Sequence, residues 1–211
     1  MVDKQLKKRG INDDKVLNAF LTVPRHRFVP EDRQEMAYED GPLPIGEGQT
    51  ISQPYIVAEM IQALDLHEND NVLEVGTGSG YATAILSRIT EKVYSIERYQ
   101  LLADKADKLF ESLGYDNIEI NIGDGTKGWQ KKAPFSGILV SAAAPEIPQT
   151  LKRQLKKDGC LVLPVGDRNI QELFQLRYKD DGEYSKKSMG MVRFVPLIGK
   201  EGWKKGDSKR W

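Results

Sequence analysis

Residues 72–81 read Val72-Leu73-Glu74-Val75-Gly76-Thr77-Gly78-Ser79-Gly80-Tyr81, and these ten residues carry the clearest signal of fold class in the chain. Three alternate glycines follow an apolar run typical of a buried strand and precede a helical pattern. Glycine permits a tight turn and lets a ligand lie against bare backbone, while the following helix points unpaired N–H groups toward that ligand. The stretch therefore predicts a strand, a ligand-binding loop and a helix. The alternative is a glycine turn that only closes a strand–helix corner.

Short β-rich runs and helical patterns alternate from residue 70 to residue 166, which is the rhythm of parallel βαβ units. The predicted strands cover residues 71–75, 92–96, 118–122, 137–140 and 160–164. The predicted helices cover residues 82–89, 101–113 and 148–156. The expected fold class is therefore α/β, with a Rossmann-like, doubly wound, mostly parallel sheet and helices on both faces.

The residues before this core predict two helices and one long loop. The apolar spacing over residues 12–21 indicates a short amphipathic helix with Asn12 as its N-cap. Glycine and proline crowd residues 40–54, and a long loop in a small domain is usually functional. A helix with proline in its first turn is expected from Pro54.

The residues after the core predict an antiparallel hairpin added at the sheet edge. Its strands cover residues 173–178 and 191–197, with a turn at Asp180-Asp181-Gly182. We expect one domain for all 211 residues. Its parts are an N-terminal extension with helices and the active-site loop (1–69), a cofactor-binding core (70–166), C-terminal strands (167–199) and a basic tail with two tryptophans (200–211), loose unless those tryptophans dock.

Composition argues against several classes of function. Lys+Arg 31 and Asp+Glu 31 give a net charge of +0, so no overall field holds the protein on nucleic acid or an anionic membrane. Mean hydropathy is −0.50, and no apolar run is long enough to predict a membrane span. The single cysteine, Cys160, and the basic start without an apolar region favour a cytosolic protein. With two separate histidines, His26 and His67, no zinc-type site is expected.

Two acidic residues end the strands that follow the glycine loop. Glu97 lies about 20 residues downstream, where a carboxylate can accept hydrogen bonds from both ribose hydroxyls. Asp124, in Gly123-Asp124-Gly125, could accept a hydrogen bond from an adenine amino group or could be an ordinary turn aspartate. Two carboxylates repel a phosphate and favour a cation. They predict an adenosine ligand without phosphate, a form that S-adenosylmethionine has.

The whole pattern resembles the protein-L-isoaspartate (D-aspartate) O-methyltransferases, within the wider class I methyltransferase fold. The resemblance runs nearly from end to end. It is carried by Arg27-Phe28-Val29-Pro30, Gly48-Gln49-Thr50-Ile51-Ser52-Gln53-Pro54, Gly76-Thr77-Gly78-Ser79-Gly80-Tyr81, Gly123-Asp124-Gly125, Ser141-Ala142-Ala143-Ala144-Pro145 and Val192-Arg193-Phe194-Val195-Pro196-Leu197.

This resemblance implies methyl transfer from S-adenosylmethionine to the free α-carboxylate of L-isoaspartyl residues in damaged proteins and peptides, with D-aspartyl residues left open as further acceptors. The ester then collapses to a succinimide, whose hydrolysis returns some normal aspartate. The resemblance further implies that Ser52 is the active-site residue. The implied cofactor positions are Gln49, Thr50, Ile51, Ser52, Gly76, Thr77, Gly78, Glu97, Asp124 and Gly125. The chain departs from the family pattern at Val57, where some relatives have histidine, and at Ile198, where some have a polar residue.

The residue inventory suits a carboxylate as the methyl acceptor. An α-carboxyl group has a pKa of about 3.3 to 3.7, so it is ionised at neutral pH and needs no general base. The reaction needs in-line placement, exclusion of water and a donor that holds the carboxylate. Ser52 can be that donor, although a serine two residues before Pro54 could equally cap the following helix.

Small and apolar residues are expected to form the substrate side of the site. The alanines leave room for a peptide backbone and the other residues form a second wall, whereas the alternative for each segment is ordinary core packing. The expected substrate residues are Ala142, Ala143, Ala144, Val195, Pro196 and Leu197.

Two other functions stay open at this point. A class I methyltransferase acting on RNA or a small molecule would share the glycine loop, Glu97 and Asp124, and a non-catalytic S-adenosylmethionine-binding protein would keep the fold without turnover. The zero net charge and the absence of an Asn/Asp-Pro-Pro-Tyr/Phe loop count against an RNA substrate. We expect a monomeric repair enzyme whose partners are damaged proteins and peptides, without nucleic acid, membrane or metal.

Overall fold

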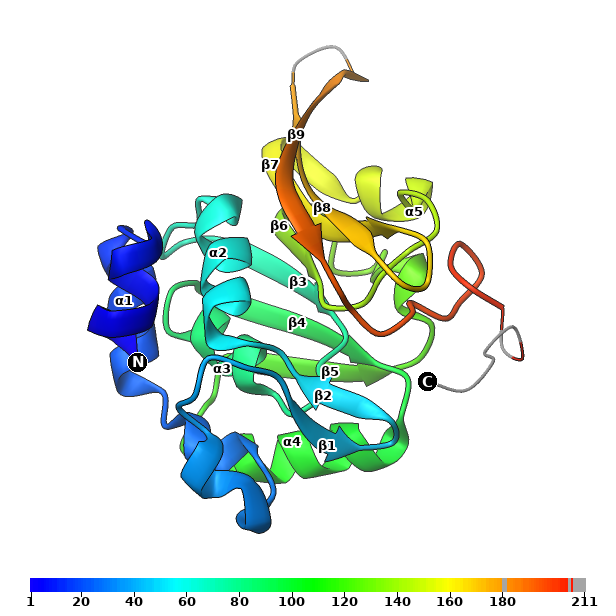
Figure 1. The fold of residues 1–211 in the computed structure, drawn as a ribbon. Helices are drawn as coiled ribbons and strands as arrows, with labels where there is room; N and C mark the ends of the chain where they lie inside the picture. Colours follow the sequence, from blue (N-terminus) through cyan, green and yellow to red (C-terminus); the bar gives the residue numbers. More distant parts are fainter. Residues whose placement is uncertain (180–181, 205, 207–211) are drawn as a thin grey trace.

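The computed structural model describes residues 1–179, 182–204 and 206. Its centre is a seven-stranded sheet with the strand order β5-β4-β3-β6-β7-β8-β9 (Figure 1). Strands β3 to β7 run parallel, and β8 and β9 run antiparallel at one edge, so the predicted α/β class is confirmed. The strands are β3 (Asn71–Val75), β4 (Lys92–Glu97), β5 (Ile118–Ile122), β6 (Phe135–Val140), β7 (Leu155–Gly166), β8 (Gln171–Tyr178) and β9 (Tyr184–Val192).

Helices cover the two faces of the sheet unequally. Successive side chains of β3 point to opposite faces, so Val72 packs in one hydrophobic cluster and Leu73 in the other. The first four α-helices contribute to the Val72 cluster, whereas the fifth contributes Leu151 to the Leu73 cluster. The α-helices are α1 (Asp14–Thr22), α2 (Pro54–Leu64), α3 (Tyr81–Ser87), α4 (Gln100–Ser112) and α5 (Gln149–Lys152). Shorter helical turns cover Val2–Leu6, Lys7–Arg9, Arg25–Phe28, Glu31–Met36 and Gly125–Lys127.

The start of α1 corrects one prediction. The N-cap is Asp13, whose side chain accepts hydrogen bonds from the backbone N–H groups of Lys15 and Val16. The predicted cap, Asn12, is wrong, because its own backbone N–H and that of Asp13 donate to the side-chain oxygen of Gln62. This contact ties the start of α1 to α2.

The segment predicted as a long loop, residues 40–54, contains a small antiparallel hairpin of β1 (Leu43–Gly46) and β2 (Gln49–Ile51). Its turn has left-handed backbone at Glu47 (φ 52°) and Gly48 (φ 67°). The strands escaped prediction because they are short and rich in glycine and proline. Helix α2 follows almost at once and begins at Pro54 as predicted.

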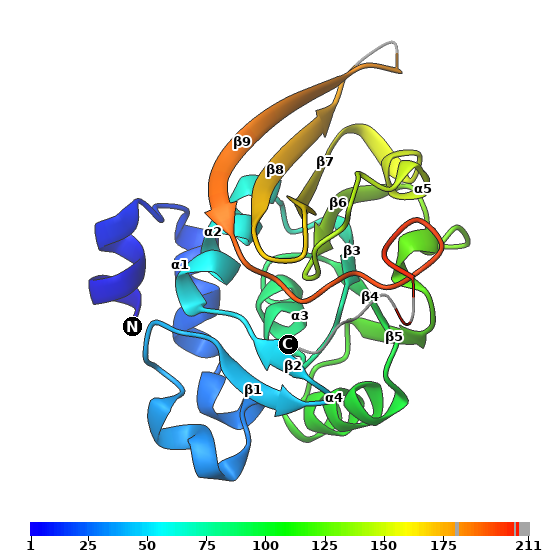
Figure 2. The same ribbon diagram turned by 45° about the vertical axis from the view of Figure 1, so that its right-hand side comes forward.

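The C-terminal half departs from prediction at α5 and at β9. The helix predicted over residues 148–156 ends at Lys152, since Leu155 already pairs with Phe135 of β6. The second hairpin strand was predicted over residues 191–197 but covers Tyr184–Val192, so the two ranges share only residues 191 and 192. After Val192 the chain leaves the hairpin and crosses the end of β6 (Figure 2). Asp180 and Asp181 of the predicted turn lie outside the described residues.

The segment that crosses β6 is fixed to the residues after that strand. The backbone N–H of Leu197 donates to the Ala143 carbonyl at 2.8 Å, and the indole N–H of Trp203 donates to the same oxygen at 3.1 Å. Trp203 therefore docks the first part of the predicted tail. Trp211 lies outside the described residues.

Candidate active site

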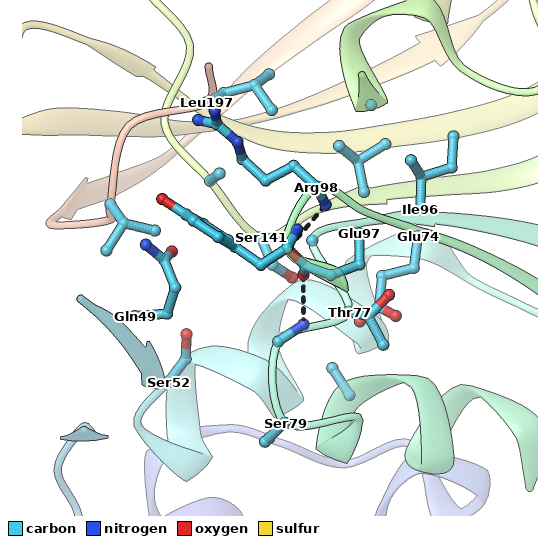
Figure 3. A pocket seen from close by; sticks show the side chains of 18 of the residues that line it. Gln49, Ser52, Glu74, Thr77, Ser79, Ile96, Glu97, Arg98, Ser141 and Leu197 are labelled. Atoms are coloured by element: carbon cyan, nitrogen blue, oxygen red, sulfur yellow. Dashed lines mark hydrogen bonds between the residues drawn. The ribbon is translucent and has the colours of Figure 1, made fainter. Parts of the chain in front are cut away.

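A cavity lies at the carboxyl ends of β3, β4 and β6. The strand order switches direction between β3 and β6, and such a switch point is where open α/β sheets bind ligands. Figure 3 shows side chains from several elements converging on this cavity. It is lined by residues 49–52, 57, 74–79, 81, 82, 96–99, 123, 125, 141, 142 and 195–198.

The glycine loop after β3 turns through left-handed backbone. The φ angle is 98° at Gly76, 54° at Gly78 and 87° at Gly80, a region that favours glycine. The N–H of Gly76 donates to the carbonyl of Ile96 at 2.8 Å, and that of Gly78 to Glu97 Oε2 at 2.9 Å (Figure 3). These bonds tie the loop to the end of β4. The predicted cofactor residues Gly76, Thr77 and Gly78 all line the cavity.

Glu97 is buried at the end of β4 and has three backbone partners. Its Oε2 accepts from Gly78, and its Oε1 accepts from the N–H groups of Arg98 (2.8 Å) and Tyr99 (2.9 Å). A carboxylate oxygen has two lone pairs, so one on Oε2 stays available. Glu97 can therefore accept a ligand hydroxyl while its own position is fixed.

A second carboxyl group, that of Glu74 on β3, is fully buried and also lines the cavity. Its Oε2 accepts from the hydroxyls of Thr83 and Ser95, the latter at 2.7 Å. Its Oε1 has no hydrogen-bond partner among the described residues. Burial raises the pKa of Glu74 to about 7, against the two hydroxyl donors that lower it. An unpaired carboxylate oxygen here favours a cationic group of a ligand.

Asp124 differs from the other predicted cofactor residues, because it does not line the cavity while its neighbour Gly125 does. Its Oδ1 accepts from the N–H and hydroxyl of Thr126, at 3.0 and 2.7 Å, and its Oδ2 accepts from the N–H of Lys200 at 2.9 Å. Burial raises the pKa of Asp124, but these hydrogen bonds outweigh it and hold the pKa below its ordinary value. The carboxylate thus caps a short helical turn and fixes the C-terminal segment.

Gly125 brings bare backbone to the cavity for a steric reason. A Cβ atom at this position would lie 2.3 Å from Cγ1 of Val75, so a side chain would collide with β3. Glycine at this position therefore lets the segment after β5 pack directly against the end of β3, beside the cavity.

Ser52 lies between the end of β2 and the start of α2. The N-cap of α2 is Gln53, and the Ser52 hydroxyl has no hydrogen bond to any described residue, so the capping role is not what the structure shows. In Figure 3 the side chains of Ser52 and Gln49 project into the cavity. The predicted residues Gln49, Thr50, Ile51 and Ser52 all line it.

A second cavity adjoins the first. Its lining includes residues 42, 50, 52, 53, 56, 141, 169, 170 and 191–195. Thr50, Ser52, Ser141 and Val195 line both cavities, so these four residues mark the junction between them.

The predicted substrate residues fall into two groups. Ala142 and residues 195–197 line the first cavity, whereas Ala143 and Ala144 are buried and line neither of the two. The carbonyl of Ala143 holds Leu197 and Trp203, and Ala144 forms a bridge with Val165. Ala143 and Ala144 therefore fix the wall behind the cavity.

The lining residues that were not predicted as site residues include four polar ones, Glu74, Arg98, Tyr99 and Ser141. Arg98 and Tyr99 directly follow Glu97, and Ser141 is the first residue after β6, so their place at the carboxyl ends of parallel strands was a usable signal. For Glu74 the signal was an acidic residue inside an apolar strand. The two departures from the family pattern, Val57 and Ile198, line the cavity as well.

The described residues contain neither a cluster of metal-ligating side chains nor a helix able to span a membrane. In residues 1–179, 182–204 and 206, no group of three or more His, Cys, Asp or Glu side chains is arranged to hold a metal ion. None of the helices in that part of the chain has the length and apolar character needed to cross a membrane.

Comparison with known proteins identifies relatives along nearly the whole chain. Residues 1–202 match the family described as Protein-L-isoaspartate(D-aspartate) O-methyltransferase. The protein-L-isoaspartate O-methyltransferase of Pelotomaculum thermopropionicum is 62% identical over 203 residues, which are 96% of this chain and 89% of that protein. That of Petrotoga mobilis is 56% identical over 204 residues, 96% of each chain.

Solved structures agree with these sequence matches. One protein-L-isoaspartate O-methyltransferase structure superposes with a TM-score of 0.86 at 30% identity and covers 96% of this chain and 67% of its own. A Plasmodium falciparum structure described as this type of enzyme, in complex with S-adenosyl-L-homocysteine, has a TM-score of 0.79 at 28% identity and covers 93% and 96%. The chain therefore belongs to the protein-L-isoaspartate(D-aspartate) O-methyltransferase family, whose members are methyltransferases that use S-adenosylmethionine and act on isoaspartyl residues in protein repair.

Proposed function

We propose that Ser52 holds the acceptor carboxylate while this enzyme transfers a methyl group from S-adenosylmethionine to the free α-carboxylate of L-isoaspartyl residues in damaged proteins and peptides. The observation that carries the proposal is the position of Ser52, which lines both the strand-end cavity and the adjoining second cavity. A hydroxyl at this junction reaches the boundary between the cofactor and the peptide. Family membership supports the reaction, and the geometry supports the roles of the residues.

The residues of the first cavity fit S-adenosylmethionine. Glu97 has a free lone pair for a ribose hydroxyl, and Gly125 lines the same cavity. The unpaired Oε1 of Glu74 suits a positively charged amino-acid end. We assign Gln49, Thr50 and Ile51 to cofactor binding, because all three line the first cavity from the side of the loop. When bound, S-adenosylmethionine supplies the methyl group on a sulfonium whose charge disappears as the methyl leaves for the carboxylate oxygen.

The chain's own residues need to place the acceptor rather than to move a proton. The acceptor carboxylate is ionised at neutral pH, so no general base is required. The Ser52 hydroxyl has no hydrogen bond within the described chain and is free to donate to one carboxylate oxygen, leaving the other to attack. The apolar side chains of Val57, Val195 and Leu197 exclude water. The ester then closes to a succinimide, which returns some normal aspartate on hydrolysis.

A pair of peptides tests the reaction. Labelled S-adenosylmethionine is offered to a short peptide containing isoaspartate and to its normal-aspartate twin, and base-labile methyl groups released as methanol are counted. Label in the isoaspartyl peptide alone is the expected result, and a D-aspartyl peptide shows whether that site is also used. Label in neither aspartyl form, with label in RNA or in a small acceptor, would overturn the proposed substrate.

The role of Ser52 is tested by Ser52→Ala. Removing one donor aimed at the reacting group costs about 100-fold in kcat, whereas cofactor affinity is expected to stay near the wild-type value. Isothermal titration with S-adenosylhomocysteine and the methanol assay measure the two quantities. Ser112→Ala is the matched control, since the Ser112 hydroxyl only donates to Leu109 on an exposed helix end. Wild-type kcat in Ser52→Ala would remove the assigned role.

We also propose that the enzyme works in the cytosol as a monomer, with flexible or unfolded protein segments as partners and no nucleic acid. The single cysteine and the zero net charge support this. Light scattering at working concentration measures the mass, and fractionation of the source cells measures the compartment. A dimer mass, or recovery outside the cytosol, would contradict the respective part.

A further inference from the structure

Arg25 is an arginine with no exposed surface, in the helical turn that precedes the active-site hairpin. None of the ion pairs found among the described residues involves it. Burial lowers the pKa of Arg25, although the nearby Tyr81 partly opposes this. Arginine is almost never fully buried unless it is paired with an acid. Other contacts must therefore compensate for this buried charge.

The guanidinium contacts three separate segments. Its Nε donates to the carbonyl of Ala37 at 2.7 Å, and its Nη2 donates to the carbonyl of Ser52 at 2.8 Å. Its Cζ lies 4.7 Å from the centre of the Tyr81 ring, within cation–π distance. The rigid fork of donors allows one side chain to hold both carbonyls at once.

These partners belong to the elements that build the cavity. Ser52 lies at the junction of the two cavities, and Tyr81 begins α3 directly after the glycine loop and lines the first cavity. The Tyr81 ring is itself held edge-on by Phe20 and Phe28, at centroid distances of 5.8 and 5.6 Å. Arg25 thus connects the Ser52 loop to a fixed aromatic cluster beside the glycine loop.

The Ser52 loop needs such an anchor. Ser52 lies outside β2, which ends at Ile51, and outside α2, which begins at Pro54. The Ser52 hydroxyl has no hydrogen bond to described residues, so its position depends on its rotamer and on the backbone that carries it. The bond from Arg25 to the Ser52 carbonyl is the long-range contact that fixes this backbone.

We propose that Arg25 is a positioning residue for methyl transfer, which holds the backbone of Ser52 so that its hydroxyl faces the acceptor. This rests on the role proposed for Ser52. Arg25 touches neither cavity, so its effect on the reaction passes through Ser52 and Tyr81.

Arg25→Lys and Arg25→Gln test the proposal. The lysine variant keeps the charge but loses the fork, and the glutamine variant removes the buried charge and keeps one donor group, so it stays informative if the lysine variant does not fold. We expect kcat/KM for the isoaspartyl peptide to fall about 100-fold in both, the effect of a small misplacement of a reacting group. Arg27→Lys and Arg27→Gln are matched controls at an exposed arginine two residues away, expected to behave as wild type.

Two further readouts separate positioning from general destabilisation. In a Ser52→Ala background the Arg25 substitutions are expected to cause little additional loss, because the group they position is already absent. Amide hydrogen exchange at residues 52 and 53 is expected to accelerate in the Arg25 variants and not in the Arg27 variants.

The outcomes are distinguishable. An undiminished 100-fold loss in the Ser52→Ala background, or wild-type kcat/KM in both Arg25 variants, overturns the positioning role. Wild-type kcat in Ser52→Ala alone would overturn the role proposed for Ser52. The amide exchange rates then test Arg25 separately. Unchanged exchange at residues 52 and 53 in the Arg25 variants would show that Arg25 does not hold this backbone.

Discussion

The two sides of the active-site cavity are held in different ways. The strand-end wall, residues 74–79, 96–99, 123, 125, 141 and 142, continues directly from β3, β4, β5 and β6. The loop wall, residues 49–52 and 195–198, belongs to segments that lie outside the large sheet. The strand-end wall is fixed by sheet hydrogen bonds between neighbouring strands, such as that of Gly76 with Ile96. In the loop wall, residues 49–51 pair only with the short strand β1, and Ser52 and residues 195–197 are held by a few bonds from distant residues, such as Arg25 and Ala143.

The two walls should therefore respond differently to substitution. Many sheet hydrogen bonds stabilise the strand-end wall together. The wall can therefore stay folded despite the free-energy cost of ionising a buried carboxyl group such as that of Glu74. The loop wall has fewer such bonds, and the Ser52 carbonyl is held by the one from Arg25. A substitution in the strand-end wall should therefore change mainly stability or cofactor binding, and one in the loop wall should change turnover or peptide KM.

The largest effect on stability is expected from Glu74→Gln in the strand-end wall. Because the pKa of Glu74 is about 7 in the folded protein and near 4.5 when unfolded, the folded state binds more protons between these pH values. The wild-type free energy of unfolding should therefore fall as pH rises from about 4.5 to 7, and stay low above that. A neutral amide has no such cost of ionisation. The free energy of unfolding of Glu74→Gln at pH 8 should therefore exceed that of wild type by up to about 3 kcal/mol.

Urea unfolding at several pH values measures this difference. Glu111→Gln, at an exposed glutamate on α4, is the control and should keep the wild-type pH dependence. The same fall in stability in Glu74→Gln and in wild type would show that Glu74 does not ionise in this range.

An intermediate effect is expected from Gly199→Ala, next to the loop wall. An added Cβ would lie 2.0 Å from Oδ1 of Asp124, so the segment must shift and the bond between Asp124 and Lys200 must break. Overpacking of this kind destabilises by about 2 kcal/mol, and we expect KM for cofactor or peptide to rise with it. Gly41→Ala is the control, because a Cβ there meets open space. An unchanged free energy of unfolding and an unchanged KM in Gly199→Ala would show that the segment can shift without a free-energy cost.

The smallest effect is expected from Trp203→Phe. The ring still packs under the Arg168 side chain, but the hydrogen bond to the Ala143 carbonyl is lost. One such bond contributes about 1 kcal/mol. Trp129→Phe makes the same change at an indole whose N–H has no hydrogen bond, so the difference between the two free energies of unfolding isolates the bond. Equal losses in both variants would show that the Trp203 bond is not stabilising.

The strands and the glycine loop behind the strand-end wall could be predicted from local sequence patterns, although its Glu74, Arg98, Tyr99 and Ser141 were not predicted as site residues. Strands β3 and β5 have the predicted bounds, and Gly76, Gly78, Glu97 and Gly125 all line the cavity. Such positions follow from local patterns, because an apolar run, a glycine turn and the carboxyl end of a parallel strand are fixed by a few consecutive residues.

The residues of the loop wall, 49–52 and 195–197, were predicted through the family resemblance and line the cavity, but the contacts that hold them could not be predicted. The family motif pointed to Ser52, but nothing near Arg25 in the sequence indicates that it binds a carbonyl 27 residues away. Asp124 was predicted at a cofactor, and its carboxylate is engaged by Lys200, 76 residues distant in the chain. The strand predicted up to Leu197 stops at Val192 because the tertiary contacts with Ala143 take over. Local propensity carries no information about such partners.

The position of Cys160 in β7 has a consequence for the chemical resistance of this enzyme. The thiol has no exposed surface, and burial raises its pKa to about 11. Only the thiolate reacts with oxidants and alkylating reagents, and at pH 7 about one thiol in 10,000 is in that form. Modification of this single cysteine must therefore wait until the sheet opens. A maleimide added to the native protein would therefore react only with molecules in which the strand around Cys160 has opened, so the extent of labelling reports how often that opening occurs.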